Sequence, residues 1–193
     1  MTDVSSGQFL QGPCPSLALS ELPFLSTPPL FDVRTAEEYT QGYIPGALNQ
    51  PLFDHLERST IGTLYKQVSP ESAKAAGLCY AEPRVQKLLE SFQPWQKQPL
   101  IIYCARGGMR SASVVRLLNS EGFTAKQLRG GYKHYRQQVL QALEQWSPSL
   151  IVLHGLTGVG KTLLLKQLPD HLDLEDLAQH RSSCLLYTSD AAD

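Results

Sequence analysis

Cys104 stands in a sequence pattern that could perform nucleophilic chemistry. It directly follows the all-apolar run 100–103, a predicted buried strand, and precedes a glycine-containing loop and a predicted helix. In an open α/β sheet, sites form at the carboxyl ends of strands, where loop N–H groups and a helix amino terminus stabilise a thiolate or a bound anion. The predicted catalytic residues are Cys104, Arg106 and Arg110, and Gly107 and Gly108 would let the loop backbone curl.

The spacing Cys104-x5-Arg110 leaves the type of reaction open. A thiolate in an anion cradle that is closed by arginine serves sulfur transfer as well as phosphate-ester hydrolysis. The alternative interpretation is a buried, unreactive cysteine at the end of a strand. The arginines and glycines of the loop favour the reactive nucleophile.

A second pattern, G-x4-G-K-T, begins at Gly155 and ends at Thr162. It follows the apolar run 150–153 and opens a predicted helix, which is the context that a phosphate loop requires. Backbone amides would cradle phosphates, the lysine would pair with their charge, and the threonine would offer a ligand to Mg²⁺. The predicted phosphate-binding residues are Gly155, Gly158, Gly160, Lys161 and Thr162. Three acidic residues downstream are either partners of this loop or a solvated turn: Asp173, Glu175 and Asp176.

Strand-like and helix-like segments alternate along the chain, which predicts an α/β fold with a parallel sheet flanked by helices. The predicted strands are 30–33, 47–49, 100–103, 126–128 at a sheet edge, and 150–153. The predicted helices are 17–22, a capped turn from 35, 71–76, 85–92, 111–120, 132–146 and one that ends at 168. Ser147-Pro148 breaks the chain and marks the best domain boundary.

Composition and charge exclude several classes of protein. A net charge of −1 excludes a uniformly basic nucleic-acid-binding chain, but residues 102–136 carry seven basic residues against one acidic residue, or +6. That stretch is either an RNA-binding face or an ordinary solvated face, and its Tyr132 and Tyr135 would either stack on bases or pack. The chain shows no apolar run near the ~20 residues of a membrane helix, no secretory signal and no zinc-ligand spacing. We therefore expect a cytoplasmic protein with reduced cysteines, no metal site and no membrane partner.

The sequence around the first long strand resembles the amino-terminal signature of rhodanese domains: Asp32-Val33-Arg34, Glu38 and Gly42-Tyr43-Ile44-Pro45-Gly46-Ala47. Tyr43 stands where that signature usually has histidine. By this resemblance, Cys104 corresponds to the rhodanese cysteine that carries a persulfide. Its loop is one residue longer than is typical, which would admit a larger group such as bound selenium.

Rhodanese-like and phosphate-loop patterns in this order closely resemble the bacterial tRNA 2-selenouridine synthase family. Further motifs carry the resemblance: Gly62-Thr63-x-Tyr65-Lys66-Gln67, Gly130-Gly131-Tyr132-Lys133 and Asp173-Leu-Glu175…His180-Arg181. The resemblance implies replacement of sulfur by selenium in wobble 2-thiouridine of tRNA, with selenophosphate as donor. It also implies geranyl diphosphate as a substrate and S-geranyl-2-thiouridine as an intermediate. The implied partners are tRNA and selenophosphate, and the only candidate cofactor is Mg²⁺.

The resemblance also divides the chain into three predicted parts. Residues 1–147 would form a rhodanese-like domain with a lead-in, 148–183 a partial P-loop domain, and 184–193 a non-native tail. A single strand–loop–helix unit cannot bury both faces of its strand, so it would dock on the first domain or stay poorly packed. We expect such a truncated chain to have weak activity or none. Two other functions stay open, a cysteine phosphatase of rhodanese fold and a non-catalytic RNA- or nucleotide-binding module.

Overall fold

The computed structural model describes residues 14–22, 28–156 and 158–177 of the chain. Compact packing divides the chain into two units, Met1–Gln145 and Trp146–Asp193. The predicted tail 184–193, including Cys184, lies outside the described residues. Within the described ranges, we find no helix whose length and apolar content would let it span a bilayer.

The first unit is built on a five-stranded sheet in which every neighbouring pair is parallel. Its strands are β1 (Ser16–Leu17), β2 (Leu30–Asp32), β3 (Leu48–Asn49), β4 (Pro99–Tyr103) and β5 (Thr124–Leu128). Their order is β1-β5-β4-β2-β3, so β4 is central, as its unbroken apolar run predicts. The predicted parallel α/β fold with flanking helices is therefore confirmed.

The prediction that 126–128 forms an edge strand is wrong. The short strand β1 pairs with β5 through Ser16 and Leu17, so β1 and β3 are the edges of the sheet. The helix predicted over 17–22 is also wrong. This segment contains the end of β1 followed by one 3₁₀ turn, η2 (Leu19–Glu21). Two residues in a lead-in without any period are too short a signal to predict a strand.

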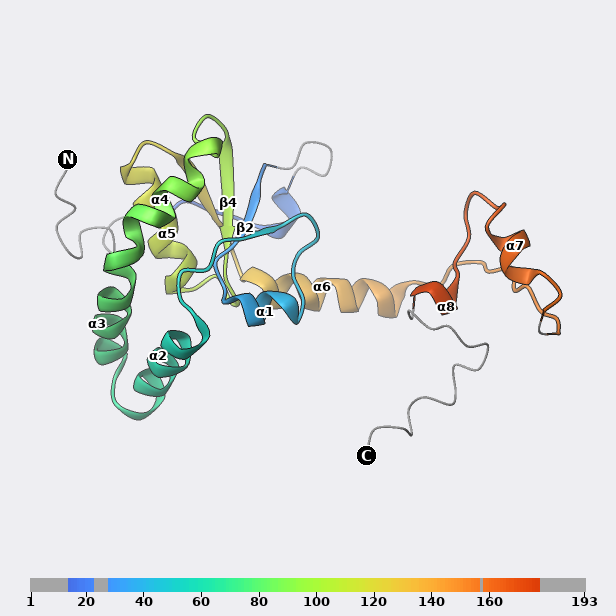
Figure 1. The fold of residues 1–193 in the computed structure, drawn as a ribbon, viewed down its shortest axis with the longest axis horizontal. Coiled ribbons are helices and arrows are strands. Elements are labelled where there is room, and N and C mark those ends of the chain that lie inside the picture. The colour runs from blue at the N-terminus through green and yellow to red at the C-terminus, as the bar shows by residue number, and fades with distance from the viewer. Residues whose placement is uncertain (1–13, 23–27, 157, 178–193) are drawn as a thin grey trace. The chain divides into compact units, whose positions relative to one another are not determined.

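Helices cover both faces of the sheet. They are α1 (Ala36–Thr40), α2 (His55–Gln67), α3 (Pro70–Ala81), α4 (Val85–Phe92), α5 (Met109–Ser120) and α6 (Gly131–Gln145), with 3₁₀ turns η3 (Glu82–Arg84) and η4 (Gln93–Trp95). Figure 1 shows α4 and α5 on one side of β2 and β4, with α6 on the other side. Side chains that alternate along β4 therefore enter two different layers of the core.

The two layers are distinct clusters of buried side chains. Leu100 and Ile102 belong to the larger cluster, together with Phe31, Phe92 and residues of α5. Ile101 and Tyr103 belong to the smaller cluster, against which side chains of α6 pack. Since Cys104 continues the alternation of Leu100 and Ile102, it lies in the layer of α4 and α5.

The segment 54–82 folds as a helical hairpin, although its sequence predicts only one short helix. Helix α2 begins at a capping box in which Asp54 accepts from the Glu57 N–H and Glu57 accepts from the Asp54 N–H. Helix α3 begins after the Ser69 cap. The signal that we overlooked is the Asp-x-x-Glu box, because the polar composition of α2 hides its helical period.

The second unit differs from its prediction. Residues 150–153, expected to form a buried strand, have no regular structure, and Ile151 is 98% exposed. A strand needs a neighbour for its N–H and C=O groups, and the described residues of this unit contain no other strand. The helix after the phosphate loop, α7 (Lys161–Leu165), is shorter than predicted, and α8 (Leu174–Leu177) follows.

Truncation of Phe92 tests the larger core layer. The ring is 0% exposed and meets Phe31 edge-on at 4.7 Å between centroids. We expect Phe92→Ala to lower the free energy of unfolding by about 3–5 kcal/mol, measured by urea unfolding with circular dichroism. Leu56 on α2 is 76% exposed, so Leu56→Ala is the matched control and should change the free energy of unfolding little. Equal effects of the two substitutions would contradict this assignment of the core.

Candidate functional site

Cys104 lies at the carboxyl end of the central strand and is only 3% exposed. Its Sγ accepts hydrogen bonds from the Gly108 N–H at 3.3 Å and from the Ser111 hydroxyl at 3.2 Å. Gly108 is also the residue that caps α5, so the sulfur faces the amino terminus of that helix. A negative sulfur is therefore matched by hydrogen-bond donors and by the helix dipole.

Gln127 on β5 supports these donors from behind. Its side-chain amide donates to the Ser111 hydroxyl at 2.8 Å and to the Gly108 carbonyl at 3.0 Å. The Ser111 hydroxyl has one hydrogen, which it can give either to Cys104 or to the Gly108 carbonyl at 3.3 Å. Gln127 donates to the Ser111 oxygen, so it fixes the hydroxyl beside the sulfur. Our sequence reasoning missed both Ser111 and Gln127, since nothing in the pattern connects β5 with the loop.

The surroundings of Cys104 lower its pKa. Burial raises the pKa of the thiol, but the Ser111 hydroxyl and N–H, the charge of Arg110 and the Arg106 N–H outweigh burial. The pKa therefore lies below the ordinary thiol value of 9.0. A thiolate is the nucleophilic form of cysteine, so this residue is suited to attack an electrophile.

The two predicted arginines have different environments. Arg110 forms a bidentate ion pair with Glu38 at 2.6 and 3.2 Å. Its charge also lowers the pKa of Cys104, without a hydrogen bond to the sulfur. Burial raises the pKa of Glu38, but the pairing with Arg110, the Thr35 N–H and the charge of Arg58 together outweigh burial, so that pKa lies below its ordinary value. Arg106 is exposed, and we find no ion pair for its side chain among the described residues. Arg106 is thus the predicted catalytic arginine that is available to an incoming anion.

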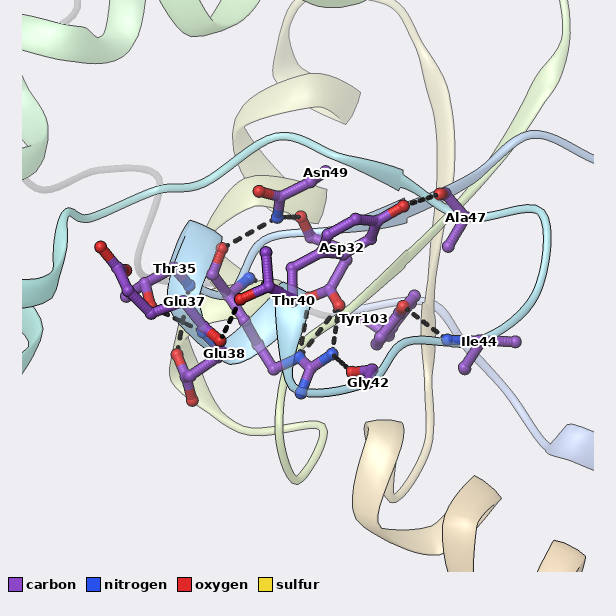
Figure 2. Close-up of polar contacts among 12 residues, drawn as sticks. Asp32, Thr35, Glu37, Glu38, Thr40, Gly42, Ile44, Ala47, Asn49 and Tyr103 are labelled. Atoms are coloured by element: carbon purple, nitrogen blue, oxygen red, sulfur yellow. Dashed lines mark hydrogen bonds and ion pairs between the residues drawn. The ribbon is translucent and has the colours of Figure 1, made fainter. Parts of the chain in front are cut away.

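The Asp-Val-Arg signature forms a buried polar network beside the site, whose contacts around Asp32 are drawn in Figure 2. Arg34 donates to both carboxylate oxygens of Asp32 and to the Gly42 carbonyl, and its guanidinium lies 4.1 Å from the Tyr132 ring centroid. Asn49 donates to the backbone carbonyls of Asp32 and Arg34. The signature residues therefore hold the ends of β2 and β3 against α6, and they do not contact the sulfur in any hydrogen bond described here.

The Gly130-Gly131 turn interlocks with the cysteine loop. The N–H groups of Tyr132 and Lys133 donate to the carbonyls of Cys104 and Ala105 at 3.0 and 2.9 Å. Gly131 has φ +55°, and a Cβ there would overlap the Cys104 carbonyl oxygen. Gly107 has φ +63°, and a Cβ there would lie 2.8 Å from the Gly130 nitrogen. Only glycine allows the two loops to approach this closely.

A cavity of about 1050 Å³ opens beside Cys104 within the first unit. We call it the Cys104 cavity. Apolar side chains from α2, α3, α4 and α5 form part of its lining, including Ile61, Leu78, Leu88, Val114 and Leu117. Its basic lining residues are Arg58, Lys66, Lys74, Arg106 and Arg110. Gly62, Thr63, Tyr65, Lys66 and Gln67, the motif on α2, also line it.

In the predicted basic face at 102–136, two arginines form ion pairs and the two tyrosines pack against the core. Arg110 pairs with Glu38, and Arg129 approaches Glu21 at 3.4 Å. Tyr132 and Tyr135 pack against the smaller core cluster. Of the two predicted roles, stacking on bases or packing, the structure therefore favours packing. Sequence reasoning did not name Arg58, Lys66 and Lys74 as binding residues, because it did not predict that α2 and α3 pack together beside Cys104.

The phosphate loop lies in the second unit. Gly158 and Gly160 have φ of +83° and +85°, and α7 begins at Lys161 directly after them. The Lys161 ammonium donates to the carbonyls of Gly155 and Leu156 at 2.9 and 2.8 Å. Asp173 accepts from the Asp176 N–H at the start of α8. In the described part of the chain, we find no group of three acidic, histidine or cysteine residues that could hold a metal, so Mg²⁺ at Thr162 stays a prediction.

Comparison with known proteins adds two family matches. The rhodanese-like domain family matches residues 19–138, and the tRNA 2-selenouridine synthase AAA domain family matches residues 148–187. The tRNA 2-selenouridine synthase of Cronobacter sakazakii is 42% identical over 158 residues, which cover 80% of this chain and 42% of that protein. That of Salmonella agona is 41% identical over 163 residues, 82% of this chain and 45% of that protein. The chain thus spans less than half the length of these relatives.

A solved structure extends the likeness to the fold. The N-terminal domain of a protein described as ATP/GTP-binding, from Clostridium difficile 630, is 36% identical with a TM-score of 0.60. The match covers 65% of this chain and 98% of that domain.

Removal of the hydrogen bonds to the sulfur should raise the pKa of Cys104. A hydrogen bond to a charged group is worth about 1.5 kcal/mol, so Ser111→Ala should slow alkylation of Cys104 at neutral pH roughly tenfold and move its midpoint to higher pH. Gln127→Met should shift the midpoint in the same direction by less. Iodoacetamide kinetics with peptide mapping separate Cys104 from the other thiols.

Ser113→Ala is the matched control for these variants, because Ser113 also lies on α5 and lines the cavity. Its alkylation profile should match that of the unsubstituted chain. An unchanged profile for Ser111→Ala would refute the proposed stabilisation of the thiolate.

Proposed function

We propose, on the premise that this chain belongs to the rhodanese-like domain family, that Cys104 is the nucleophile for replacing sulfur by selenium in 2-thiouridine of tRNA. The observation that carries the proposal is a buried thiol of lowered pKa at the wall of a large cavity. The match to the tRNA 2-selenouridine synthase AAA domain family and the relatives of that name support a tRNA substrate. A tRNA substrate would also place the reaction in the cytoplasm.

The electron balance favours attack at the base over storage of selenium on Cys104. Selenophosphate carries selenium as selenide, so a Cys104–selenium bond would require phosphorus to leave with the bonding electron pair and be reduced. Displacement at C2 of the base avoids this. The Cys104 thiolate would attack C2 of S-geranyl-2-thiouridine and expel geranyl thiolate, which is protonated to the thiol.

A second displacement would complete the exchange. The selenium of selenophosphate would attack the same C2, the C2–Sγ bond would break, and Cys104 would leave as a thiolate. Water would then cleave the P–Se bond, leaving selenouridine and phosphate. No oxidant or reductant is consumed, and the lowered pKa of Cys104 makes its thiolate a better leaving group than an ordinary cysteine thiolate.

The lining of the Cys104 cavity supports a geranylated substrate. Part of its lining is apolar, with side chains such as Ile61, Leu88 and Leu117, and would accept an isoprenoid chain. The exposed Arg106 would bind the selenophosphate or the phosphoryl group beside the sulfur.

The phosphate loop is proposed to bind a phosphate-bearing substrate such as geranyl diphosphate. The residues that would hold it are Gly155, Gly158, Gly160, Lys161 and Thr162. Lys161 would exchange the carbonyls of Gly155 and Leu156 for phosphate oxygens, and Mg²⁺ bound at Thr162 would neutralise phosphate charge.

A covalent-trapping experiment tests the role of Cys104. An anticodon stem-loop RNA with S-geranyl-2-thiouridine at the wobble position is incubated with the chain without selenophosphate. We expect release of geranyl thiol and a protein–RNA adduct on a denaturing gel. Cys104→Ser should form no adduct, whereas Cys79→Ser, at an exposed thiol, should behave as the unsubstituted chain. Geranyl thiol release by Cys104→Ser at the unsubstituted rate would refute the assignment.

A further inference from the structure

The hairpin α2–α3 gives the Cys104 cavity a strongly positive wall. Among the lining residues, five are basic and none is acidic, on a chain whose net charge is −1. Arg110 is neutralised by Glu38, and Arg106 belongs to the cysteine loop. The remaining cations all come from the hairpin: Arg58, Lys66 and Lys74. A positive wall of this kind needs an anionic ligand.

Lys66 and Lys74 are exposed, and the charge of Arg58 acts on Glu38 without a direct ion pair. In the described ranges we find no ion pair for Arg58, Lys66 or Lys74. The Arg58 guanidinium lies over Gly62, where a Cβ would come within 2.8 Å of its Nη1. The glycine therefore leaves room for the arginine to lie along the helix surface.

Tyr65 places an aromatic ring among these charges. It is 61% exposed and lines the same cavity. Arg58, Gly62, Tyr65 and Lys66 are spaced by four, three and one residues, so they share one face of α2. An exposed ring flanked by cations is the arrangement with which proteins bind single-stranded nucleic acids, by stacking on bases and pairing with phosphates.

We propose that α2 and α3 form the RNA-binding wall of the Cys104 cavity, where Tyr65 stacks on an unpaired base and Arg58, Lys66 and Lys74 bind backbone phosphates. This proposal rests on the function proposed above and adds the surface that recognises the nucleic acid. It assigns RNA recognition to the hairpin, and not to residues 102–136, which the sequence suggested as an RNA-binding face.

The spread of the cations favours RNA over an isoprenoid diphosphate as their ligand. Arg58 and Lys66 are eight residues apart, which is about 12 Å along the helix axis. Lys74 adds a third charge from the other helix. One diphosphate group cannot reach all three, whereas successive phosphates of a strand can. The isoprenoid chain would contact the apolar side chains that line the cavity, and not the cations of the hairpin.

RNA affinity measured by fluorescence anisotropy tests the stacking role. The probe is a labelled anticodon stem-loop RNA without modified bases, titrated with the whole 193-residue chain. Stacking on one base is worth about 1–3 kcal/mol, so Tyr65→Ala should bind roughly 5- to 150-fold more weakly. Tyr65→Phe keeps the ring and should bind as the unsubstituted chain. Undiminished binding by Tyr65→Ala, or no binding by the unsubstituted chain, would overturn the proposal.

The salt dependence of binding tests the phosphate contacts. Each lost contact to a single strand lowers the slope of log K against log salt by about 0.7, so Lys66→Ala with Lys74→Ala should lower it by about 1.4. Lys133→Ala with Arg136→Ala is the matched control, because both are exposed cations on α6 within the stretch 102–136. Its slope should stay unchanged. A larger loss in the control than in the hairpin variant would overturn the proposal.

Two further readouts separate this proposal from the one on which it rests. The alkylation rate of Cys104 should be the same in all hairpin variants, since none of them contacts the sulfur. Loss of RNA binding with intact Cys104 reactivity then supports the hairpin assignment, even if the exchange reaction fails. If Tyr65→Ala and the lysine variant weaken protection of Cys104 by geranyl diphosphate but leave RNA affinity unchanged, the RNA assignment is wrong.

Discussion

A buried thiol of lowered pKa at the end of the central strand is the constraint around which this domain is organised. Removing a negative charge from water is costly unless donors replace the lost hydration. Here the Gly108 N–H and the Ser111 hydroxyl supply the bonds, and Gln127 fixes the serine. The close approach of Gly131 holds the same loop from its other side. Each of these residues comes from a different part of the β4–loop–α5–β5–α6 sequence, so the fold itself assembles the site.

Charge is divided between the chemistry and the recognition of a ligand. The Asp32–Arg34 and Glu38–Arg110 pairs are internal, and they fix the backbone around the cysteine loop without leaving a net charge. Among the described residues that line the cavity, Arg58, Lys66 and Lys74 on the helical hairpin and Arg106 in the cysteine loop form no ion pair. This arrangement allows a large anionic substrate to be held by the hairpin while its reacting atom reaches Cys104 in the same cavity.

The sequence is sufficient to predict what local patterns determine. The apolar run before Cys104 identifies the central strand, and the glycines after it identify the loop. The capping box at Thr35 and Glu38 marks the start of α1. The sequence does not reveal long-range contacts. The bond from Gln127 to Ser111 depends on strand register, and β1 depends on a pairing with β5 over more than a hundred residues. The strand predicted at 150–153 fails for the same reason, since a strand exists only with a partner.

The central claim is that the surroundings of Cys104 lower the pKa of its thiol below the ordinary value. Its most direct test is a titration of thiolate ultraviolet absorbance, taken as the difference between the unsubstituted chain and Cys104→Ala. The difference isolates one sulfur from the other three. We predict a midpoint clearly below the ordinary thiol pKa of 9.0, which disappears when the chain is unfolded. A midpoint at or above 9.0 in the folded chain would contradict the account.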